Sequence, residues 1–304
     1  KKSIFKIKDP LYLHANSNNF DFIPQLYFIQ GKRDEALEFA IDNKKMICLD
    51  GTYECLDANH LNFLEGGFYH SFYYDEALEL IEITLSRTAE ELNLEGEDLG
   101  IKKQAYYRTG MINMKWGEYD KAIKGYMNAE KLVLEYQDDD HAAWWSPHYK
   151  MRIGQTYMLM ENYKKAAEYY LKSYLQAREL HSINEKNNES KHSYGVERES
   201  ICYYGYIESL LSNHESAKKH INECIDKLNN EEEAGAITEE TGGYGTYLPL
   251  YLYYNHIENQ ELAKKYITLA YEATGEEEIR KYHEDPNRDT NPKRFYSRDI
   301  IKIY

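Results

Sequence analysis

The sequence has few cysteines, the residues that form disulfides and many zinc sites. Four cysteines occur among the 304 residues, and they are Cys48, Cys55, Cys202 and Cys224. They form no Cys-x-x-Cys pair and have no zinc-ligand spacing to a histidine, so the sequence predicts no metal site. We expect these cysteines to be reduced, small and mostly buried, as in a protein of the reducing cytoplasm.

Long apolar runs and an excess of basic residues are also missing. The longest apolar stretch, Tyr247–Tyr254, has eight residues and includes Pro249, whereas a membrane-spanning helix needs about 20 apolar residues. The first ten residues, KKSIFKIKDP, contain no apolar core of signal-peptide length. Acidic residues outnumber basic ones by 52 to 37, which gives a formal net charge of −15. We therefore expect neither nucleic acid nor a membrane surface as the main partner, because both attract basic patches.

No catalytic or cofactor-binding signature is present. The sequence lacks the GxSxG, HExxH, EF-hand and phosphate-binding glycine–lysine motifs. Gly242–Gly245 is glycine-rich but no lysine follows it, so we interpret this segment as a flexible link. We interpret the acidic run Asp138–Asp140 with His141 as a solvated loop between helices. The sequence thus predicts a protein without enzymatic activity, cofactor or bound metal.

Tyrosine is abundant instead. The chain contains 31 tyrosines, against 9 phenylalanines and 3 tryptophans. The sequence is therefore poor in purely aliphatic side chains and rich in side chains with an apolar body and a polar tip. This composition favours a thin fold with a large surface over a compact globule.

A helix–turn–helix pattern repeats along the chain. Three segments align best, Phe63–Leu85, Tyr106–Leu132 and Tyr149–Ala177. Each has a small residue on a first helix, then a turn, an aromatic residue and an alanine on a second helix with helical apolar spacing. One alanine marks each strong or weak copy, and these marker alanines are Ala36, Ala77, Ala122, Ala166, Ala217 and Ala263.

Small residues at fixed places in the copies predict close helix packing. Gly110, Gly154 and Gly205 lie on the first helices, where they would let the second helix approach closely. Ala122 and Ala166 would do the same from the second helix, and tyrosines would fill the wedges between hairpins. A single hairpin cannot bury both of its faces, so neighbouring hairpins must stack.

This pattern resembles the tetratricopeptide repeat (TPR) family over about residues 20–275. The resemblance implies an all-α fold, a right-handed α-solenoid of about six helical hairpins. Residues 1–19 would form an N-terminal lead-in and residues 276–304 an irregular C-terminal tail. The marker alanines are 41, 45, 44, 51 and 46 residues apart, against about 34 in a standard TPR. We expect the surplus residues in longer second helices and loops, a spacing similar to that of the Rap-type peptide receptors of bacteria.

In a TPR array, one stripe of each first helix lines a concave groove. The resemblance places ten candidate partner-binding residues of this sequence there: Asn62, Tyr69, Tyr107, Met111, Met114, His148, Met151, Gln155, Met158 and Tyr206. Four of the seven methionines of the chain belong to this stripe, and methionine-rich grooves adapt to apolar side chains. The same methionines could instead be core residues packed between helices. The stripe has no basic clamp for an acidic C-terminal tail, so it favours a partly apolar peptide.

We therefore expect a cytoplasmic, non-enzymatic scaffold that binds a protein or peptide segment in the groove. Two alternatives remain open: a peptide-responsive regulator resembling the Rap-type receptors, and a sensor or adaptor module of a larger effector with a protease or kinase. The Rap-type alternative requires a further domain before the first repeat, for which residues 1–19 are too short. The identity of the partner and the oligomeric state do not follow from the sequence.

Overall fold

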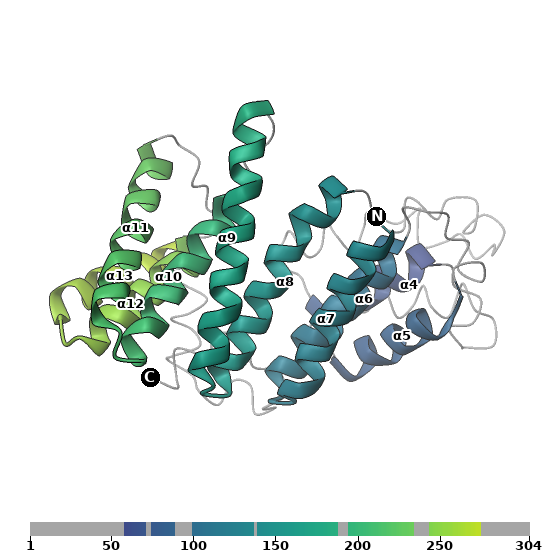
Figure 1. Cartoon of the computed structure of the whole chain (residues 1–304). Coiled ribbons are helices and arrows are strands. Elements are labelled where there is room, and N and C mark those ends of the chain that lie inside the picture. The colour runs from purple at the N-terminus through teal and green to yellow at the C-terminus, as the bar shows by residue number, and fades with distance from the viewer. Residues whose placement is uncertain are drawn as a thin grey trace, which may run out of the picture. The chain divides into compact units, whose positions relative to one another are not determined.

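The structure, a computed structural model, describes residues 58–70, 74–88, 99–136, 139–187, 194–233 and 243–274, and all regular structure within these ranges is α-helix. The helices are α4 (Ala58–His70), α5 (Tyr74–Ser86), α6 (Leu99–Lys115), α7 (Tyr119–Tyr136), α8 (Asp139–Leu159), α9 (Tyr163–Asn187), α10 (Tyr194–Leu210), α11 (His214–Glu233), α12 (Gly243–His256) and α13 (Gln260–Thr274) (Figure 1). The expected all-α class is confirmed for this part of the chain. The copy around Ala36, the expected lead-in and tail, Cys48 and Cys55 lie outside the described residues.

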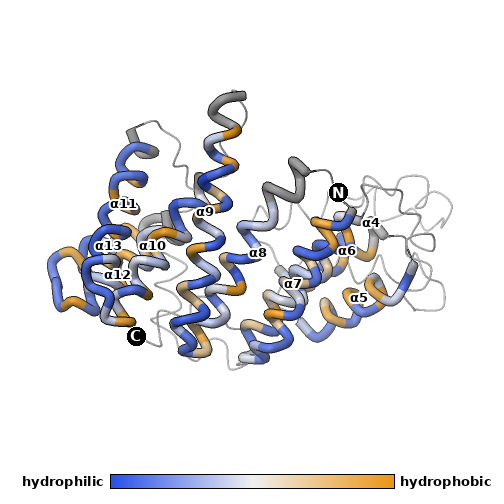
Figure 2. The backbone as a smooth tube through the Cα atoms, in the orientation of Figure 1, coloured by the Kyte–Doolittle hydropathy of each residue, from blue (hydrophilic) through white to orange (hydrophobic). Residues whose placement is uncertain are grey.

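The chain divides into two compact units. The first unit comprises residues 1–132 and 291–304, and the second unit comprises residues 133–290. In the first unit α4 packs against α5, and both contact α6. In the second unit α9 packs against α8 and α10, α10 also contacts α11 and α12, and α12 packs against α13. Hydrophobic and hydrophilic residues alternate along most of these helices (Figure 2), and they separate most clearly onto two sides in α7, α11 and α13.

The same turn joins the two helices of four copies. Each turn has three residues, and the middle one has a left-handed backbone. The φ angle is 75° at Gly117, 57° at Glu161, 62° at Ser212 and 60° at Glu258. In each turn the next amide donates a hydrogen bond to the carbonyl five residues earlier: Glu118 to Asn113, Asn162 to Tyr157, Asn213 to Glu208 and Asn259 to Tyr254, all at 2.9 Å. This pattern is the Schellman ending of an α-helix. The marker alanines 122, 166, 217 and 263 each lie five residues after the left-handed residue, so here the sequence repeat is also a structural repeat.

Close helix contacts occur at the predicted glycines. A Cβ added to Gly110 would lie 2.5 Å from the ring of Tyr126, a distance that atoms cannot adopt. A Cβ at Gly154 would approach Tyr170 to 3.0 Å, and one at Gly205 would approach Ile221 to the same distance. The expectation that these glycines let the paired helices approach closely is confirmed.

The second unit contains a disulfide that the sequence did not predict. Cys202 on α10 and Cys224 on α11 are fully buried and bonded to each other, with Cα atoms 5.2 Å apart. The expectation of burial is confirmed for this pair, whereas the expectation of reduced thiols is wrong for it. The turn at Ser212 folds α11 back along α10 and brings the two cysteines level, a proximity that their separation of 22 residues does not show.

Segments expected to be loops are partly helical. The acidic run is helical from Asp139, the first residue of α8, so its assignment to a loop was wrong there. Helix α8 also contains Pro147, whose carbonyl oxygen accepts a hydrogen bond of 2.7 Å from the buried Ser173 hydroxyl on α9. The second helices differ in length, since α9 has 25 residues and α11 has 20, whereas α5 has 13.

No helix within the described part of the chain is long and apolar enough to cross a membrane.

Candidate functional site

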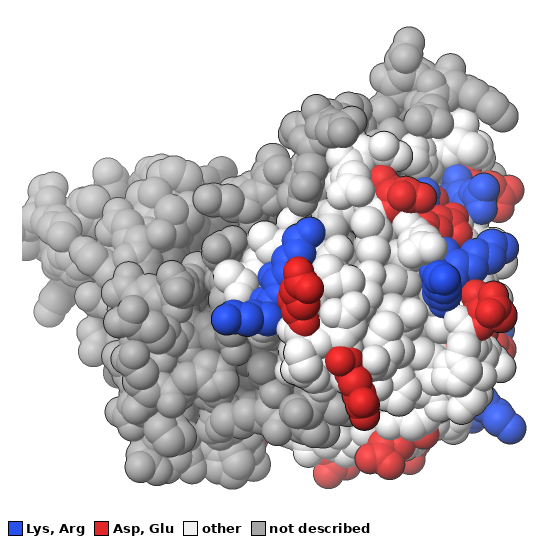
Figure 3. Space-filling view, turned by 90° about the vertical axis from the view of Figure 1, so that its left-hand side faces the viewer, with Lys and Arg blue, Asp and Glu red and all other residues white. Residues whose placement is uncertain are grey.

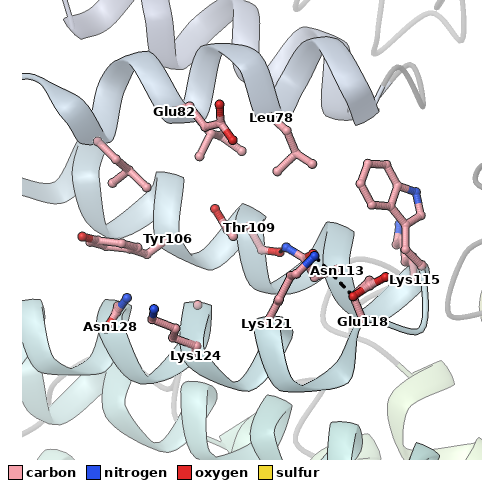
Figure 4. Close-up of a pocket in the computed structure, with 14 residues that line it drawn as sticks. Leu78, Glu82, Tyr106, Thr109, Asn113, Lys115, Glu118, Lys121, Lys124 and Asn128 are labelled. Atoms are coloured by element: carbon pink, nitrogen blue, oxygen red, sulfur yellow. Dashed lines mark hydrogen bonds and ion pairs between the residues drawn. The ribbon is translucent and has the colours of Figure 1, made fainter.

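An open cleft with a volume of about 840 Å³ lies in the first unit. Figure 4 shows α5 on one side, α7 on the other side and α6 as the floor between them. The lining residues are Leu78, Ile81, Glu82 and Leu85 of α5, Tyr106, Thr109, Asn113 and Lys115 of α6, Trp116 and Glu118 of the following turn, and Lys121, Lys124, Gly125 and Asn128 of α7. Three helices thus present side chains of different character to one space.

The wall formed by α5 is mainly apolar. Leu78, Ile81 and Leu85 recur at helical spacing on one side of this helix. Ile81 belongs to the core of the first unit, against which Leu78 and Leu85 pack while they stay partly exposed. Glu82 is the one acidic residue that α5 contributes to the cleft, and it is exposed.

The wall formed by α7 is basic. Lys121 and Lys124 are both exposed and lie three residues apart, so they share one side of the helix (Figure 4). The Lys121 ammonium group is 3.3 Å from a carboxylate oxygen of Glu118, and both side chains are more than half exposed. An ion pair this exposed is weak, so an incoming carboxylate can compete with Glu118 for Lys121.

Aromatic contacts fix the side chains of Lys115 and Trp116 at one end of the cleft. Lys115 Nζ donates a hydrogen bond of 2.9 Å to the Tyr74 hydroxyl and lies 5.1 Å from the ring centre of Tyr69. Trp116 meets the ring of Tyr74 edge-on at 6.4 Å between ring centres. These contacts fix the position of Trp116, which makes its indole a built-in reporter of the cleft.

The floor consists of polar side chains that bond to their own helix. The Thr109 hydroxyl donates to the Ala105 carbonyl at 2.9 Å, and the Asn113 amide donates to the Thr109 carbonyl at 2.8 Å. The Thr109 hydroxyl hydrogen and one amide hydrogen of Asn113 are thus used within α6, so the floor presents mainly the Thr109 methyl group, the second amide hydrogen of Asn113 and the side-chain acceptor atoms to a ligand.

Large side chains occupy a place in the second unit that corresponds to the cleft. The marker alanines align α5, α6 and α7 with α9, α10 and α11, so that Thr109 corresponds to Tyr204, Gly125 to His220, Leu85 to Tyr174 and Asn128 to Glu223. The rings of Tyr204 and His220 pack edge to face at 4.8 Å. The Tyr174 hydroxyl donates a short hydrogen bond to Glu223 and accepts one of 3.0 Å from Arg178. Burial, followed by the bond to Glu223, raises the pKa of Tyr174, so this hydroxyl stays protonated as a donor. We infer that the cleft of the first unit is open because Thr109, Leu85 and Asn128 are shorter than these side chains.

A buried charged pair lies beside the cleft, between α4 and α6. The Arg108 Nη1 atom donates hydrogen bonds of 2.8 Å to Glu65 Oε1 and to the Asn62 side-chain oxygen. Glu65 is fully buried, and its second oxygen accepts no hydrogen bond from a described residue. Burial raises the pKa of Glu65 to about 7, although Arg108 opposes this shift. The pair fixes α4 on α6 but does not line the cleft.

In the first unit, the predicted groove residues lie mostly inside the helix packing. Met114 is buried and its sulfur is 3.8 Å from the Tyr126 hydroxyl, so its placement in an open groove was wrong. Tyr107 packs against the ring of Tyr126 at 5.9 Å and is partly buried. The remaining members, Asn62, Tyr69 and Met111, are also partly buried. The Asn62 side-chain oxygen accepts a hydrogen bond from Arg108, and the Lys115 ammonium group lies over the Tyr69 ring, so both residues have a structural role.

In the second unit, four of the five predicted groove residues are core residues. Met151, Gln155, Met158 and Tyr206 are at most 7% exposed, which corrects their assignment to an open surface. Gln155 accepts a hydrogen bond of 2.9 Å from Arg152. Flexible methionines fill irregular gaps between helices well, and a register shift of one residue is enough to turn such a stripe inward.

His148 is the fifth predicted groove residue of the second unit, and it is partly buried. It packs among aromatic rings, with Trp145 edge-on at 5.9 Å between ring centres. Burial, followed by the Arg152 charge, lowers the pKa of His148 to about 3, so its imidazole is neutral at physiological pH. This environment is that of a packed histidine. Whether the partly buried stripe residues of either unit bind a partner stays a prediction.

A second charged cluster fixes α9, α10 and α11 in the second unit. Glu197 is buried on α10, where His181 Nδ1 lies 2.6 Å from one carboxylate oxygen and Lys227 Nζ lies 2.7 Å from the other. Both partners of Glu197 lie in the same unit, so the cluster joins α9 and α11 to α10 and has a structural role. No group of three or more histidine, cysteine, aspartate or glutamate residues in the described ranges could hold a metal ion.

The far end of the second unit presents a surface of another kind. Helix α12 has no Asp, Glu, Lys or Arg in its sequence GYGTYLPLYLYYNH. Figure 3 looks toward α11, α12 and α13 and shows charged side chains around a broad uncharged area. The tyrosines of this end stack on one another, as do Tyr254 and Tyr266 with ring centres 5.5 Å apart, so they are used in packing.

The cleft was missed by sequence reasoning because the repeat alignment emphasises what the copies share. Its signal is a difference between copies: Thr109 is small where the later copies have large side chains such as Tyr204. Comparison with known proteins adds no template for this site, since no family model and no curated protein matches the chain.

Proposed function

We propose that this protein is a TPR-like interaction module that acts by binding a segment of a partner protein in the first-unit cleft. The proposed architecture is a right-handed α-solenoid of helical hairpins. It is supported by the four equivalent Schellman turns and by the repeated glycine contacts of the paired helices. A repeat array of this kind offers surfaces between successive hairpins, and the cleft is one such surface.

The observation that carries the proposal is the cleft itself. Its volume of about 840 Å³ lies within the range of about 300–1,000 Å³ that is typical of ligand sites. One wall is apolar and the opposite wall is basic, which suits recognition of a side-chain pattern. The lining contains no histidine, cysteine or aspartate, and its two glutamates, Glu82 and Glu118, are exposed. Such a lining offers apolar contacts and exposed ammonium groups, which suits the binding of a segment with both kinds of side chain.

This proposal keeps the expected kind of partner but assigns it to another surface. The expected groove used the stripe of Met111, Met114, Met151 and Met158, three of which are buried. The cleft lies between second helices and uses residues that are exposed without any rearrangement of the core, such as Lys121 and Lys124.

Affinity capture from native cells with mass spectrometry tests the proposal. The informative variant is Thr109→Tyr, which fills the cleft with the residue type that the second unit has at Tyr204. The matched control is Lys131→Tyr, because Lys131 is exposed on α7 and does not line the cleft. Circular dichroism confirms that both variants keep the helical content of the unaltered protein.

We expect Thr109→Tyr to lose the specific partner and Lys131→Tyr to retain it. If both variants capture the same proteins as the unaltered chain, the cleft is not the binding site and the proposed function is wrong.

A further inference from the structure

The dimensions of the cleft fit a short piece of α-helix. The lining residues of α5 run from Leu78 to Leu85, which at a rise of about 1.5 Å per residue is a length of about 10 Å. A helix with its side chains has a diameter of about 10 Å, so two turns of helix occupy about 800 Å³. The cleft volume of about 840 Å³ is close to this value.

The packing geometry around the cleft is also that of a missing helix. Helices α5 and α7 stand on either side of α6, with their side chains directed into the space between them (Figure 4). A further helix laid on α6 would place its ridges between those of α5 and α7, as neighbouring helices in proteins do. Thr109 on the floor is small, which allows such a helix to approach α6, whereas Gly125 on α7 lets α6 and α7 pack closely.

The distribution of charge decides the character of this helix. Leu78, Ile81 and Leu85 require an apolar side toward α5. Lys121 and Lys124 lie one turn apart on α7, which matches carboxylates three or four residues apart on an adjacent helix. The chain is acidic overall, with a formal net charge of −15. Its composition therefore does not explain why basic residues form this wall of the cleft.

Glu82 sets the orientation of the bound segment. It lies on α5, opposite the two lysines, and it repels a carboxylate placed on that side. An acidic helix therefore binds with its carboxylates toward α7 only, which excludes the reversed face.

We propose that the cleft binds an acidic, amphipathic α-helix of about two turns from a partner protein, with its apolar side on α5 and its carboxylates on Lys121 and Lys124. This inference rests on the proposed function and adds the chemistry of the partner segment.

Trp116 provides a readout that is specific for the cleft. The chain contains 3 tryptophans, so a Trp144→Phe/Trp145→Phe background leaves Trp116 as the only one. The probes are three hydrocarbon-stapled peptides of twelve residues with leucines on one face and with glutamate, glutamine or lysine on the other. Titration of each peptide against Trp116 fluorescence gives a dissociation constant for the site itself.

The expected order of affinity is the glutamate peptide first, the glutamine peptide second and the lysine peptide last. Two exposed ion pairs correspond to about a tenfold difference between the glutamate and glutamine peptides. This difference should shrink at high salt, because exposed charges are screened.

The charge-reversal variant Lys121→Glu/Lys124→Glu should invert the order and bind the lysine peptide best. The control Lys131→Glu, an exposed position on the same helix, should keep the original order. Equal affinity for the three peptides, no response of Trp116 to any of them, or an order unchanged by the double variant would each overturn the inference.

The peptide order and the capture experiment separate two failures. The first failure is a cleft that does not prefer the glutamate peptide although Thr109→Tyr still abolishes capture. This result refutes an acidic helix as the bound segment and leaves the proposed function intact. Capture that is unaffected by Thr109→Tyr refutes the proposed function itself.

Discussion

The helix triplets α5–α6–α7 and α9–α10–α11 occupy equivalent positions two copies apart, yet the first contains a cleft where the second has large packed side chains. In the second unit Tyr174 and Glu223 bridge the two outer helices, and Tyr204 with His220 fills the space above the middle helix. In the first unit these positions are Leu85, Asn128, Thr109 and Gly125. The comparison shows that the repeated backbone is constant while a few side chains decide whether a copy is closed or open.

The two triplets also differ in what holds them together. The closed triplet has the buried disulfide between Cys202 and Cys224 and the buried carboxylate of Glu197 with two basic partners. The open triplet relies on close contact at Gly110, and α4 is fixed to it by the pair of Glu65 and Arg108. We expect perturbations of these features to affect the two units differently.

The largest expected effect concerns the disulfide. Cys202→Ala/Cys224→Ala removes a cross-link across 22 residues, which lowers the free energy of unfolding of the second unit by about 3.5 kcal/mol in the loop-entropy model. The measurement is denaturant unfolding followed by the fluorescence of Trp145, which lies in the second unit, in a Trp116→Phe/Trp144→Phe background. We expect this fluorescence to report the loss of stability. Unfolding followed by Trp116 should change far less. An equal loss for both tryptophans would mean that the two units unfold as one and would remove the distinction between them.

The next effect is a pH dependence of the first unit. The pKa of Glu65 is about 7 in the folded state and 4.5 when unperturbed, so the folded state holds its proton more tightly than the unfolded state. Stability contributed by this group is therefore present below about pH 4.5 and is lost as the pH rises to about 7, by as much as about 3 kcal/mol.

Glu65→Gln should abolish this part of the pH dependence, because glutamine keeps the hydrogen bond from Arg108 without titrating. The measurement is denaturant unfolding followed by Trp116 at pH 5 and pH 8. Glu82→Gln, which alters an exposed carboxylate of α5, is the control and should behave like the unaltered chain. If Glu65→Gln leaves the difference between the two pH values unchanged, the buried pair does not control the stability of the first unit.

The smallest effect distinguishes the turns of the two units. Gly117 adopts a left-handed backbone without cost, whereas Glu161 adopts the same conformation with a Cβ atom. Glu161→Gly should stabilise the second unit by about 0.5–1 kcal/mol, and Gly117→Ala should destabilise the first unit by about 1 kcal/mol. Thermal unfolding checks both signs, and effects of the same sign would contradict the equivalence of the turns.

Much of the repeated framework could be predicted from the sequence, because the features that build it are local. The marker alanines from Ala122 onward and the glycines Gly110, Gly154 and Gly205 recur at fixed distances from each turn, and the structure places them as expected. The disulfide could not be predicted, because the pairing of Cys202 with Cys224 depends on how α11 folds back on α10.

The candidate site was harder to predict, because it depends on differences between copies. Met114, Met151 and Met158 follow a shared stripe, and a shared stripe in a repeat array is more often the surface that neighbouring helices bury. The cleft depends on Thr109 and Asn128, which are ordinary residues until they are compared with Tyr204 and Glu223. The sequence contained this information, but only the structure showed which positions face one another.

The most direct test of the account is to give the open triplet the bridge of the closed one. Leu85→Tyr/Asn128→Glu introduces the pair that Tyr174 and Glu223 form in the second unit, and Trp116 reports whether the glutamate peptide still enters the cleft. We predict that the double variant stays folded and binds this peptide at least about tenfold more weakly than either single variant. Binding at the unaltered affinity by a folded double variant would contradict the claim that these side chains open the cleft and that the open cleft is the binding site.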